Sequence, residues 1–383
     1  MEFRDLKRQY QELKPQIDNA IAEVTTSGAF IMGSQVKELE QQLAQYVGTK
    51  YCITCANGTD ALTLALKAWG IGQGDAVFVP DFTFFSSAEV VSLEGATPVF
   101  VDVDIHTCNI DPADLEKAIN RAITSSTLRP RAVIAVDLFG LPANYPAIKT
   151  ICEKYNLLLL EDGAQGFGGA IGNQRNCSFG DISTTSFFPA KPLGCYGDGG
   201  AIFTDNDQWA DLLQSYRVHG KGSFKYDNVR IGLNSRLDTI QAAILKVKLK
   251  AFTDHELSNV NAAAKRYTEL LNGIVETPKI PTGFFSSWAQ YTIHLANKSL
   301  RDGLQAALKE NGIPSMVYYP TPMHLQTAYK GLRYAYDACP NAVKLCDTVL
   351  SLPMHPYITT EEIDRVCNVI KVSHYDAPDR LVI

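Results

Sequence analysis

Short apolar runs alternate with helical patterns between residues 51 and 205, and this alternation restricts the fold more than any other feature of the chain. Each run has the length and composition of a buried strand, and the intervals between runs are long enough for helices. Such an order is typical of a mostly parallel sheet with helices on both faces. The predicted strands are residues 51–55, 76–80, 97–101, 131–136, 157–162, 182–186 and 201–204.

Beyond residue 234 the apolar residues recur at helical spacing, and this pattern extends to about residue 271. We interpret the stretch as a connection to a smaller C-terminal α/β domain, with a strand at 288–295, a helix at 300–310 and a last helix from about residue 360. The predicted domains are therefore a large one over 26–250 and a small one over 251–383. An N-terminal helix at 6–24, within residues 1–25, is expected to pack near the small domain.

The composition restricts the class of protein. The chain has 383 residues, a formal net charge of −6 and no long basic run, so nucleic acid is disfavoured as a partner. Its nine cysteines are an odd number and the first residues lack an apolar leader, which favours a reduced, cytoplasmic protein. No apolar segment approaches the roughly 20 residues that cross a bilayer. Cys52 and Cys55 have no second pair to complete a metal site, and we predict no bound metal.

Lys191 lies in an otherwise uncharged stretch between Pro189 and Pro192. A lysine in such surroundings is seldom buried unless it pairs with another group or takes part in chemistry. Burial lowers the pKa of the amine toward the range in which its neutral, nucleophilic form is populated. We therefore expect Lys191 to be a reactive amine.

A carboxylate at the tip of a buried strand supplies a second group. Four leucines at 157–160 are followed by Glu161 and Asp162. A lysine and a strand-end aspartate are the pair that pyridoxal 5′-phosphate (PLP) requires, because the amine holds the cofactor and moves a proton while the carboxylate keeps the ring nitrogen protonated. Taken singly, Asp162 is also a good loop or capping residue. Gln165 is either a contact to the ring 3-oxygen or a polar surface residue.

The segment 57–62, Asn-Gly-Thr-Asp-Ala-Leu, directly follows the first predicted strand and opens a helix. Backbone N–H groups around Gly58 and the hydroxyl of Thr59 are placed to bind a phosphate at the helix N-terminus. An ordinary helix cap is the alternative interpretation. The glycine-rich run that begins at Gly166 does not complete a dinucleotide motif, because Ile171 occupies the last required position.

Three phenylalanines follow the second predicted strand. Phe84 is the candidate to stack on the pyridine ring, with Phe82 and Phe85 as competing choices. A position in the hydrophobic core is the alternative for each of them.

Five motifs together resemble the DegT/DnrJ/EryC1/StrS family of nucleotide-sugar aminotransferases over nearly the whole chain; they are residues 57–62, 161–165, 186–191, 197–201 and 234–238. The resemblance implies the PLP fold-type I architecture, with a mostly parallel seven-stranded sheet in the large domain, and a homodimer with shared active sites. It assigns the cofactor-holding amine to Lys191, the ring-nitrogen contact to Asp162 and the 3-oxygen contact to Gln165.

The same resemblance implies further contacts. Thr59 and Ser186 would bind the phosphate and Phe84 would stack on the ring. Asn234 would reach the phosphate from the neighbouring subunit. Arg236 would lie at the shared active site, where its guanidinium could bind a carboxylate of the amino donor or of the sugar; pairing with Asp238 is the alternative.

Residues 187–200 and 352–357 look most like the branch that aminates UDP-2-acetamido-2-deoxy-3-oxo-glucuronate for bacterial surface polysaccharide. The chain departs from that branch at Tyr318, where the branch tends to have a histidine, and at Gly163, where it has alanine. We expect Tyr318, Tyr319 and His324 to be substrate-binding residues, with His324 either replacing the lost imidazole or lying in a solvated loop.

The resemblance and these residues together imply a PLP-dependent aminotransferase, and the resemblance implies L-glutamate as the amino donor and a nucleotide-linked keto sugar as the acceptor. The acceptor is expected to be the UDP-linked 3-oxo-glucuronate, with other 3-keto or 4-keto UDP and dTDP sugars as alternatives. A non-catalytic binding or regulatory protein is a further alternative. A sugar dehydratase is disfavoured, because that branch has histidine in place of Lys191.

Overall fold

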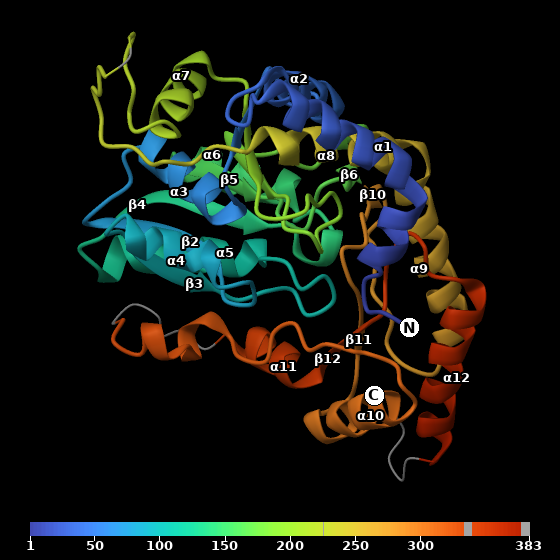
Figure 1. The fold of residues 1–383 in the computed structure, drawn as a ribbon. Helices are drawn as coiled ribbons and strands as arrows, with labels where there is room; N and C mark the ends of the chain where they lie inside the picture. The colour runs from blue at the N-terminus through green and yellow to red at the C-terminus, as the bar shows by residue number, and fades with distance from the viewer. Residues whose placement is uncertain (225, 333–338, 377–383) are drawn as a thin grey trace.

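The computed structural model describes residues 1–224, 226–332 and 339–376. Its centre is a seven-stranded sheet in the order β1-β9-β8-β5-β4-β2-β3 (Figure 1). The strands are β1 (Tyr51–Cys55), β2 (Asp75–Pro80), β3 (Thr97–Val101), β4 (Arg129–Val136), β5 (Leu158–Asp162), β8 (Ile182–Ser186) and β9 (Gly200–Thr204). All seven predicted strands are confirmed, with ends that differ by no more than two residues.

One strand reverses the direction of an otherwise parallel sheet. β9 runs antiparallel to both of its neighbours, β1 and β8, while β2, β3, β4, β5 and β8 pair in parallel. The fold class is therefore α/β with a mostly parallel sheet, as predicted. The carboxyl ends of β2, β4, β5 and β8 meet at one edge of the sheet, where parallel α/β proteins place their ligands.

Helices cover both faces of this sheet because each has one apolar side. In α5 (Pro112–Ser125) the buried residues Leu115, Ala118, Ile119 and Ala122 recur at helical spacing, and the side chain of Asp111 caps the first turn. The other helices of this layer system are α2 (Ser34–Val47), α3 (Gly58–Ala68), α4 (Ser86–Leu93), α6 (Tyr145–Tyr155) and α7 (Asp207–Tyr216).

A continuous helical rod leads from the large sheet to a second core. It consists of α8 (Thr239–Ala251), a π-helical turn η2 (Phe252–Glu256) and α9 (Leu257–Leu271). The second core lies around the antiparallel pair β11 (Tyr291–His294) and β12 (Val349–Leu352), with α10 (Lys298–Glu310) and α12 (Thr360–Asp376) packed beside it. The predicted strand at 288–295 is shorter in the structure. α11 (Pro340–Thr348), by contrast, packs into the core of the large sheet through residues such as Ala342 and Leu345.

The N-terminal helix α1 (Leu6–Ser27) lies along α8 (Figure 1). Leu13 and Ile17 pack there against Ile244 and Ala251. Just before the helix, the carbonyl of Phe3 accepts a hydrogen bond from the backbone N–H of Met354, which follows β12. The N-terminal segment therefore contacts α8 as well as the residue that follows β12.

Elements of two or three residues were not predicted. They are the strands β6 (Ala170–Ile171), β7 (Gln174–Arg175) and β10 (Phe284–Phe285), and the 3-10 turns η1 (Leu138–Gly140), η3 (Met323–Leu325) and η4 (Thr327–Tyr329). Such short elements carry no periodicity that a sequence pattern could report.

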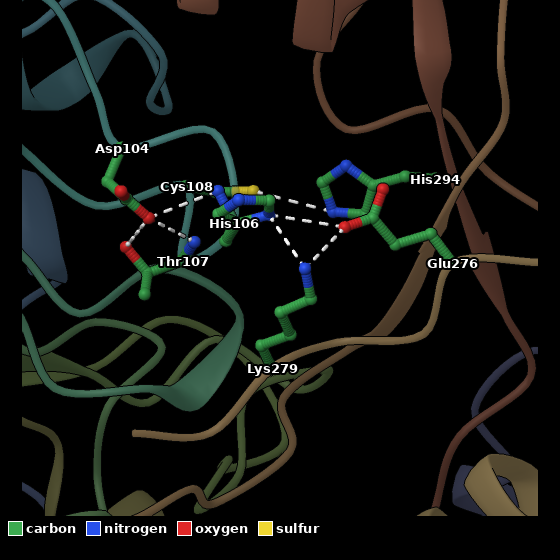
Figure 2. A network of polar contacts seen from close by, with 7 residues as sticks. All are labelled: Asp104, His106, Thr107, Cys108, Glu276, Lys279 and His294. Atoms are coloured by element: carbon green, nitrogen blue, oxygen red, sulfur yellow. Dashed lines mark hydrogen bonds and ion pairs between the residues drawn. The ribbon is translucent and has the colours of Figure 1, made fainter. Parts of the chain in front are cut away.

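A polar network joins the loop before α5 to the second core (Figure 2). Nδ1 of His106 lies 3.2 Å from a carboxylate oxygen of Glu276 and 3.2 Å from Nζ of Lys279. Cys108 Sγ lies 3.9 Å from Nε2 of the buried His294. We call these residues, with Asp104 and Thr107, the junction network.

None of the described helices is long and apolar enough to span a membrane.

Candidate active site

A cavity of about 480 Å³ opens at the carboxyl ends of the parallel strands. Nine of the twelve predicted site residues line it: Gly58, Thr59, Phe84, Asp162, Gln165, Ser186, Lys191, Tyr318 and Tyr319. They come from five separate segments of the chain, so it is the fold that brings them together. Asn234, Arg236 and His324 are not among the described residues that line this cavity.

Asp162 ends β5 and is almost fully buried at the cavity wall. One carboxylate oxygen accepts a hydrogen bond from the Ser87 hydroxyl at 2.7 Å, and the other accepts from the backbone N–H of Ala164 at 3.2 Å. Burial raises the pKa of Asp162, while these two bonds and the charge of Lys191 oppose that rise. The carboxylate is thus held in a fixed orientation, ready to pair with a cationic N–H.

Lys191 stands in a turn between β8 and β9, where its backbone N–H donates to the Phe188 carbonyl at 2.9 Å. The turn needs Gly194, because a Cβ there would lie 2.5 Å from the carbonyl oxygen of Pro189. Burial lowers the pKa of the Lys191 amine, Asp162 opposes this effect and Arg4 adds to it. A lowered amine pKa favours the nucleophilic form that the sequence led us to expect.

The side chain of Gln165 connects the turn after β4 with Tyr319. Its side-chain oxygen accepts from the backbone N–H of Phe139 at 2.7 Å, and its amide nitrogen donates to the Tyr319 hydroxyl at 3.0 Å. A side-chain amide has two N–H donors, so one remains for a ligand oxygen in the cavity. Gln165 is buried and is not the surface residue of the alternative interpretation.

Hydroxyl groups gather at the N-terminus of α3. Thr59 Oγ1 lies 2.9 Å from Ser86 Oγ, and both residues line the cavity with Ser186. Gly58 permits the close approach, because a Cβ there would lie 2.7 Å from the Cβ of Ser186. Asn57 caps the helix by accepting from the Asp60 N–H at 2.8 Å. Hydroxyls and helix-start N–H groups are the donors that bind a phosphate.

Of the three phenylalanines, only Phe84 lines the cavity, and 54% of it is exposed. Phe82 is buried in the core, and Phe85 packs against Tyr329 with ring centroids 5.4 Å apart. The hydroxyl and N–H donors at the start of α3, a strand-end carboxylate, an amine and an exposed aromatic ring therefore surround one cavity. The residues present fit PLP, a phosphorylated pyridine with a reactive carbonyl.

Three predicted residues lie elsewhere. Asn234 is exposed, and its side-chain oxygen accepts from Arg236 Nη2 at 2.6 Å. His324 is paired with the buried Asp81, which accepts from the His324 backbone N–H at 2.8 Å and lies 2.5 Å from its Nδ1. Since Asp81 follows β2, this pair fastens the loop after Tyr319 to the large sheet. His324 is thus not a solvated loop residue, and it lines a different cavity from the one that Lys191 lines.

Sequence reasoning missed Ser87, which orients Asp162, and Gln290, which lines the cavity from the second core. A signal for Ser87 was available, because Ser86 and Ser87 begin the helix that follows β2, next to the sheet edge where Asp162 ends β5. Gln290 has no comparable signal, since only the packing of the two cores brings it to the cavity.

A family model described as the DegT/DnrJ/EryC1/StrS aminotransferase family matches residues 11–371 of the chain. Among named relatives, UDP-2-acetamido-2-deoxy-3-oxo-D-glucuronate aminotransferase of Pseudomonas aeruginosa is 44% identical over 96% of this chain and 98% of its own length.

Two solved structures support the same grouping. A DegT DnrJ EryC1 StrS aminotransferase from Brucella abortus is 49% identical, with a TM-score of 0.95 over 98% of this chain and 99% of that one. NtdA from Bacillus subtilis, solved with the bound cofactor PMP, is 29% identical, with a TM-score of 0.88 over 97% of this chain and 85% of that one.

Proposed function

Because the chain belongs to the DegT/DnrJ/EryC1/StrS aminotransferase family and is a PLP-dependent nucleotide-sugar aminotransferase, we propose that it aminates UDP-2-acetamido-2-deoxy-3-oxo-glucuronate at C3 with L-glutamate as donor. The observation that carries the proposal is the single cavity that both Lys191 and Asp162 line. The identity of the relative from Pseudomonas aeruginosa supports the choice of acceptor.

Each residue of the cavity has a task in this reaction. When bound, PLP supplies a ring that accepts the electrons released as a carbon–hydrogen bond breaks. Asp162, oriented by Ser87, would keep a proton on the ring nitrogen. Lys191 would hold the cofactor and, once displaced by an incoming amine, move a proton at the reacting carbon. Thr59 and Ser186 would bind the phosphate, and Phe84 would stack on the ring.

The acceptor is tested with a panel of 3-keto and 4-keto UDP and dTDP sugars, each assayed with L-glutamate. We expect the UDP-linked 3-oxo-glucuronate to give the highest kcat/KM, and Lys191→Ala to lower that value by about 10²- to 10⁴-fold. Turnover of 4-keto sugars alone would contradict the proposed acceptor and leave the family unchanged. Full activity in Lys191→Ala would contradict the role of the lysine.

A neutral 3-keto UDP sugar is a second candidate, and one observation favours it. Lys191 is the only lysine or arginine among the described residues that line the cavity. A 6-carboxylate on the sugar would therefore need its cation from elsewhere, and Arg236 of a second copy is the candidate that the family resemblance supplies. The matched test is Arg236→Gln: a larger loss of kcat/KM for the glucuronate than for the corresponding neutral sugar supports the glucuronate, and an equal effect on both supports the neutral sugar.

We propose that the active form is a homodimer with shared active sites. Apolar side chains are exposed on two segments, Phe30, Ile31 and Met32 on one and Val229 and Ile231 on the other. The first segment forms a β-bridge with the chain just before α8, between Ile31 and Asp238. Exposed apolar side chains of this kind fit contact with a second copy of the chain better than contact with water.

Mixing two inactive variants tests the shared site. If Asn234 reaches across the dimer, each active site contains Lys191 of one subunit and Asn234 of the other. Lys191→Ala and Asn234→Ala then remove residues that different subunits contribute to the same site. Their mixture should recover up to about a quarter of wild-type activity, since random pairing yields half heterodimers with one intact site each. No recovery in a mixture that forms heterodimers would place Asn234 in its own subunit's site.

The cellular setting is part of the same proposal. All nine cysteines are buried, and the described residues contain no disulfide, which supports a reduced compartment such as the cytoplasm. The amino sugar produced there would serve surface polysaccharide synthesis.

A further inference from the structure

The N-terminal segment reaches the backbone of Lys191. Nη2 of Arg4 donates to the Lys191 carbonyl oxygen at 2.7 Å and lies 3.5 Å from the Pro192 carbonyl oxygen. The backbone N–H of Lys191 donates to Phe188 within its own turn. Both backbone polar groups of Lys191 are therefore bonded, one locally and one by a residue 187 positions away.

Arg4 is itself held on both sides. The carbonyl of the preceding Phe3 accepts from the Met354 N–H at 3.2 Å, and the Phe3 ring lies 6.2 Å from that of Tyr318. The following Asp5 caps α1 through its side chain. The segment thus connects the small core, the Tyr318 loop and the Lys191 turn, so the position of Arg4 is fixed by its neighbours and not only by its own bond.

The charge of Arg4 interacts with two ionisable groups of the α8–η2 rod, Lys248 and Glu256. Burial lowers the pKa of Arg4 to about 10, and the attraction of Glu256 opposes this effect. Glu256 is buried, accepting from Gln9 at 2.8 Å and from Tyr357 at 2.6 Å. Burial lowers the pKa of Lys248 to about 8, and Arg4 adds to that shift. The cation is therefore close enough to its neighbours to influence their charge.

Two opposite charges act on the Lys191 amine. Burial is the largest cause of its lowered pKa; Asp162 raises the pKa, and Arg4 lowers it again. Without the arginine, only burial would oppose the carboxylate, and the protonated, unreactive ammonium would be more favoured than it is now. The cation bonded to the Lys191 carbonyl offsets part of the effect of Asp162 on the amine.

We propose that Arg4 is a positioning residue for Lys191: its guanidinium fixes the Lys191 carbonyl and supplies a positive charge that offsets Asp162 at the amine. The proposal rests on the proposed function in one respect, the assignment of Lys191 as the amine that holds PLP. It goes beyond the cavity, because Arg4 lies outside its lining and acts through another residue.

The test compares Arg4→Gln and Arg4→Lys with Lys7→Gln. Lys7→Gln is the matched control, because it removes one cation from the same segment. The Lys7 side chain is 87% exposed, and its Nζ lies 3.9 Å from a carboxylate oxygen of Glu2. Two readouts use the PLP-loaded protein without any sugar. They are the pH midpoint of the visible absorbance of the bound cofactor and the rate at which hydroxylamine removes it from the protein.

We expect Arg4→Gln to raise the absorbance midpoint by about half a unit to one unit, because a nearby cation is lost. The hydroxylamine rate should change at least about threefold, since the Lys191 carbonyl is released. Arg4→Lys should restore the midpoint, as it keeps the charge, but not the rate, because an ammonium lacks the planar fork of donors. Lys7→Gln should match the wild type in both.

Two results would overturn the proposal. One is Arg4→Gln protein that is folded, loaded with PLP and unchanged in both readouts. The other is a lower melting temperature with unchanged readouts in the folded fraction, which would make Arg4 merely structural. If Arg4→Gln does not fold, the hydroxylamine rate of Arg4→Lys is the deciding measurement. A changed rate supports the proposal, and a wild-type rate overturns it. PLP on Lys191 without turnover of any nucleotide sugar would remove the proposed acceptor class and leave this inference intact.

Discussion

Two polar regions of this chain place charge in opposite surroundings. At the cavity, Asp162 is almost fully buried, Lys191 is partly buried, and both face an open space. At the junction network, Glu276 and Lys279 lie 3.0 Å apart with 33% and 57% of their side chains exposed, and they contact each other and His106 (Figure 2). In the junction network the charged side chains pair with one another and connect the two cores. At the cavity the charged side chains surround an open space, where they can bind a ligand. Substitutions should therefore affect activity at the first region and stability at the second.

The largest effect is expected from Asp162→Asn. The amide cannot stabilise a protonated ring nitrogen, so kcat/KM should fall by about 10²- to 10³-fold with little change in melting temperature. Steady-state kinetics of the PLP-loaded protein measure this. Glu276→Gln, the same change of carboxylate to amide at the junction network, is the control and should keep wild-type kinetics. Equal losses in both variants would erase the contrast between the two regions.

An intermediate effect is expected from His294, the buried member of the junction network. Burial lowers its pKa to about 4 from an ordinary value of 6.5, so between those values the unfolded chain binds more protons than the folded one. The free energy of unfolding should therefore fall as the pH falls through this window, by about 3 kcal/mol from this residue. Above pH 6.5 the contribution is complete.

Urea unfolding of the wild type and His294→Gln at pH 7.5, 6 and 4.5 measures that difference. The gap between the two proteins should change steadily in favour of the variant as the pH falls, and should be constant above pH 7. A gap that is independent of pH would show that His294 binds protons equally in the folded and unfolded chains, which would contradict a pKa lowered by burial.

The smallest effect is expected from the exposed pair. Lys279→Gln should lower the free energy of unfolding by about 0.5 kcal/mol, and by less at high salt, because solvent and ions screen half-exposed charges. Urea unfolding at low and high ionic strength measures it, with Lys265→Gln as the control on an exposed helical pair. A loss above about 2 kcal/mol would mean that the junction network behaves like a buried one.

Local patterns were enough to predict the large sheet, because each of its strands is a short apolar run between helices. Parallel strands then end at one edge, and this geometric rule brings Asp162 to the cavity that Lys191 also lines. Other features depend on contacts that no local pattern reports. The bond of His324 to Asp81 spans 243 positions, and Gln290 reaches the cavity only because the two cores pack together. Asn234 and Arg236 lie outside the cavity of their own chain, so a single sequence specifies them only through the family resemblance.

The reversed direction of β9 has a consequence for the reactive lysine. Since β8 and β9 are antiparallel neighbours, with Ser186 opposite Gly200, the chain turns back at the rim where it left the sheet. A parallel partner would have required a crossover that carries the backbone to the opposite rim before it returns. Lys191 lies in this short connection between β8 and β9, so the length of the connection determines the position of the amine. An insertion or deletion there would displace the amine directly, with no intervening helix to absorb the change.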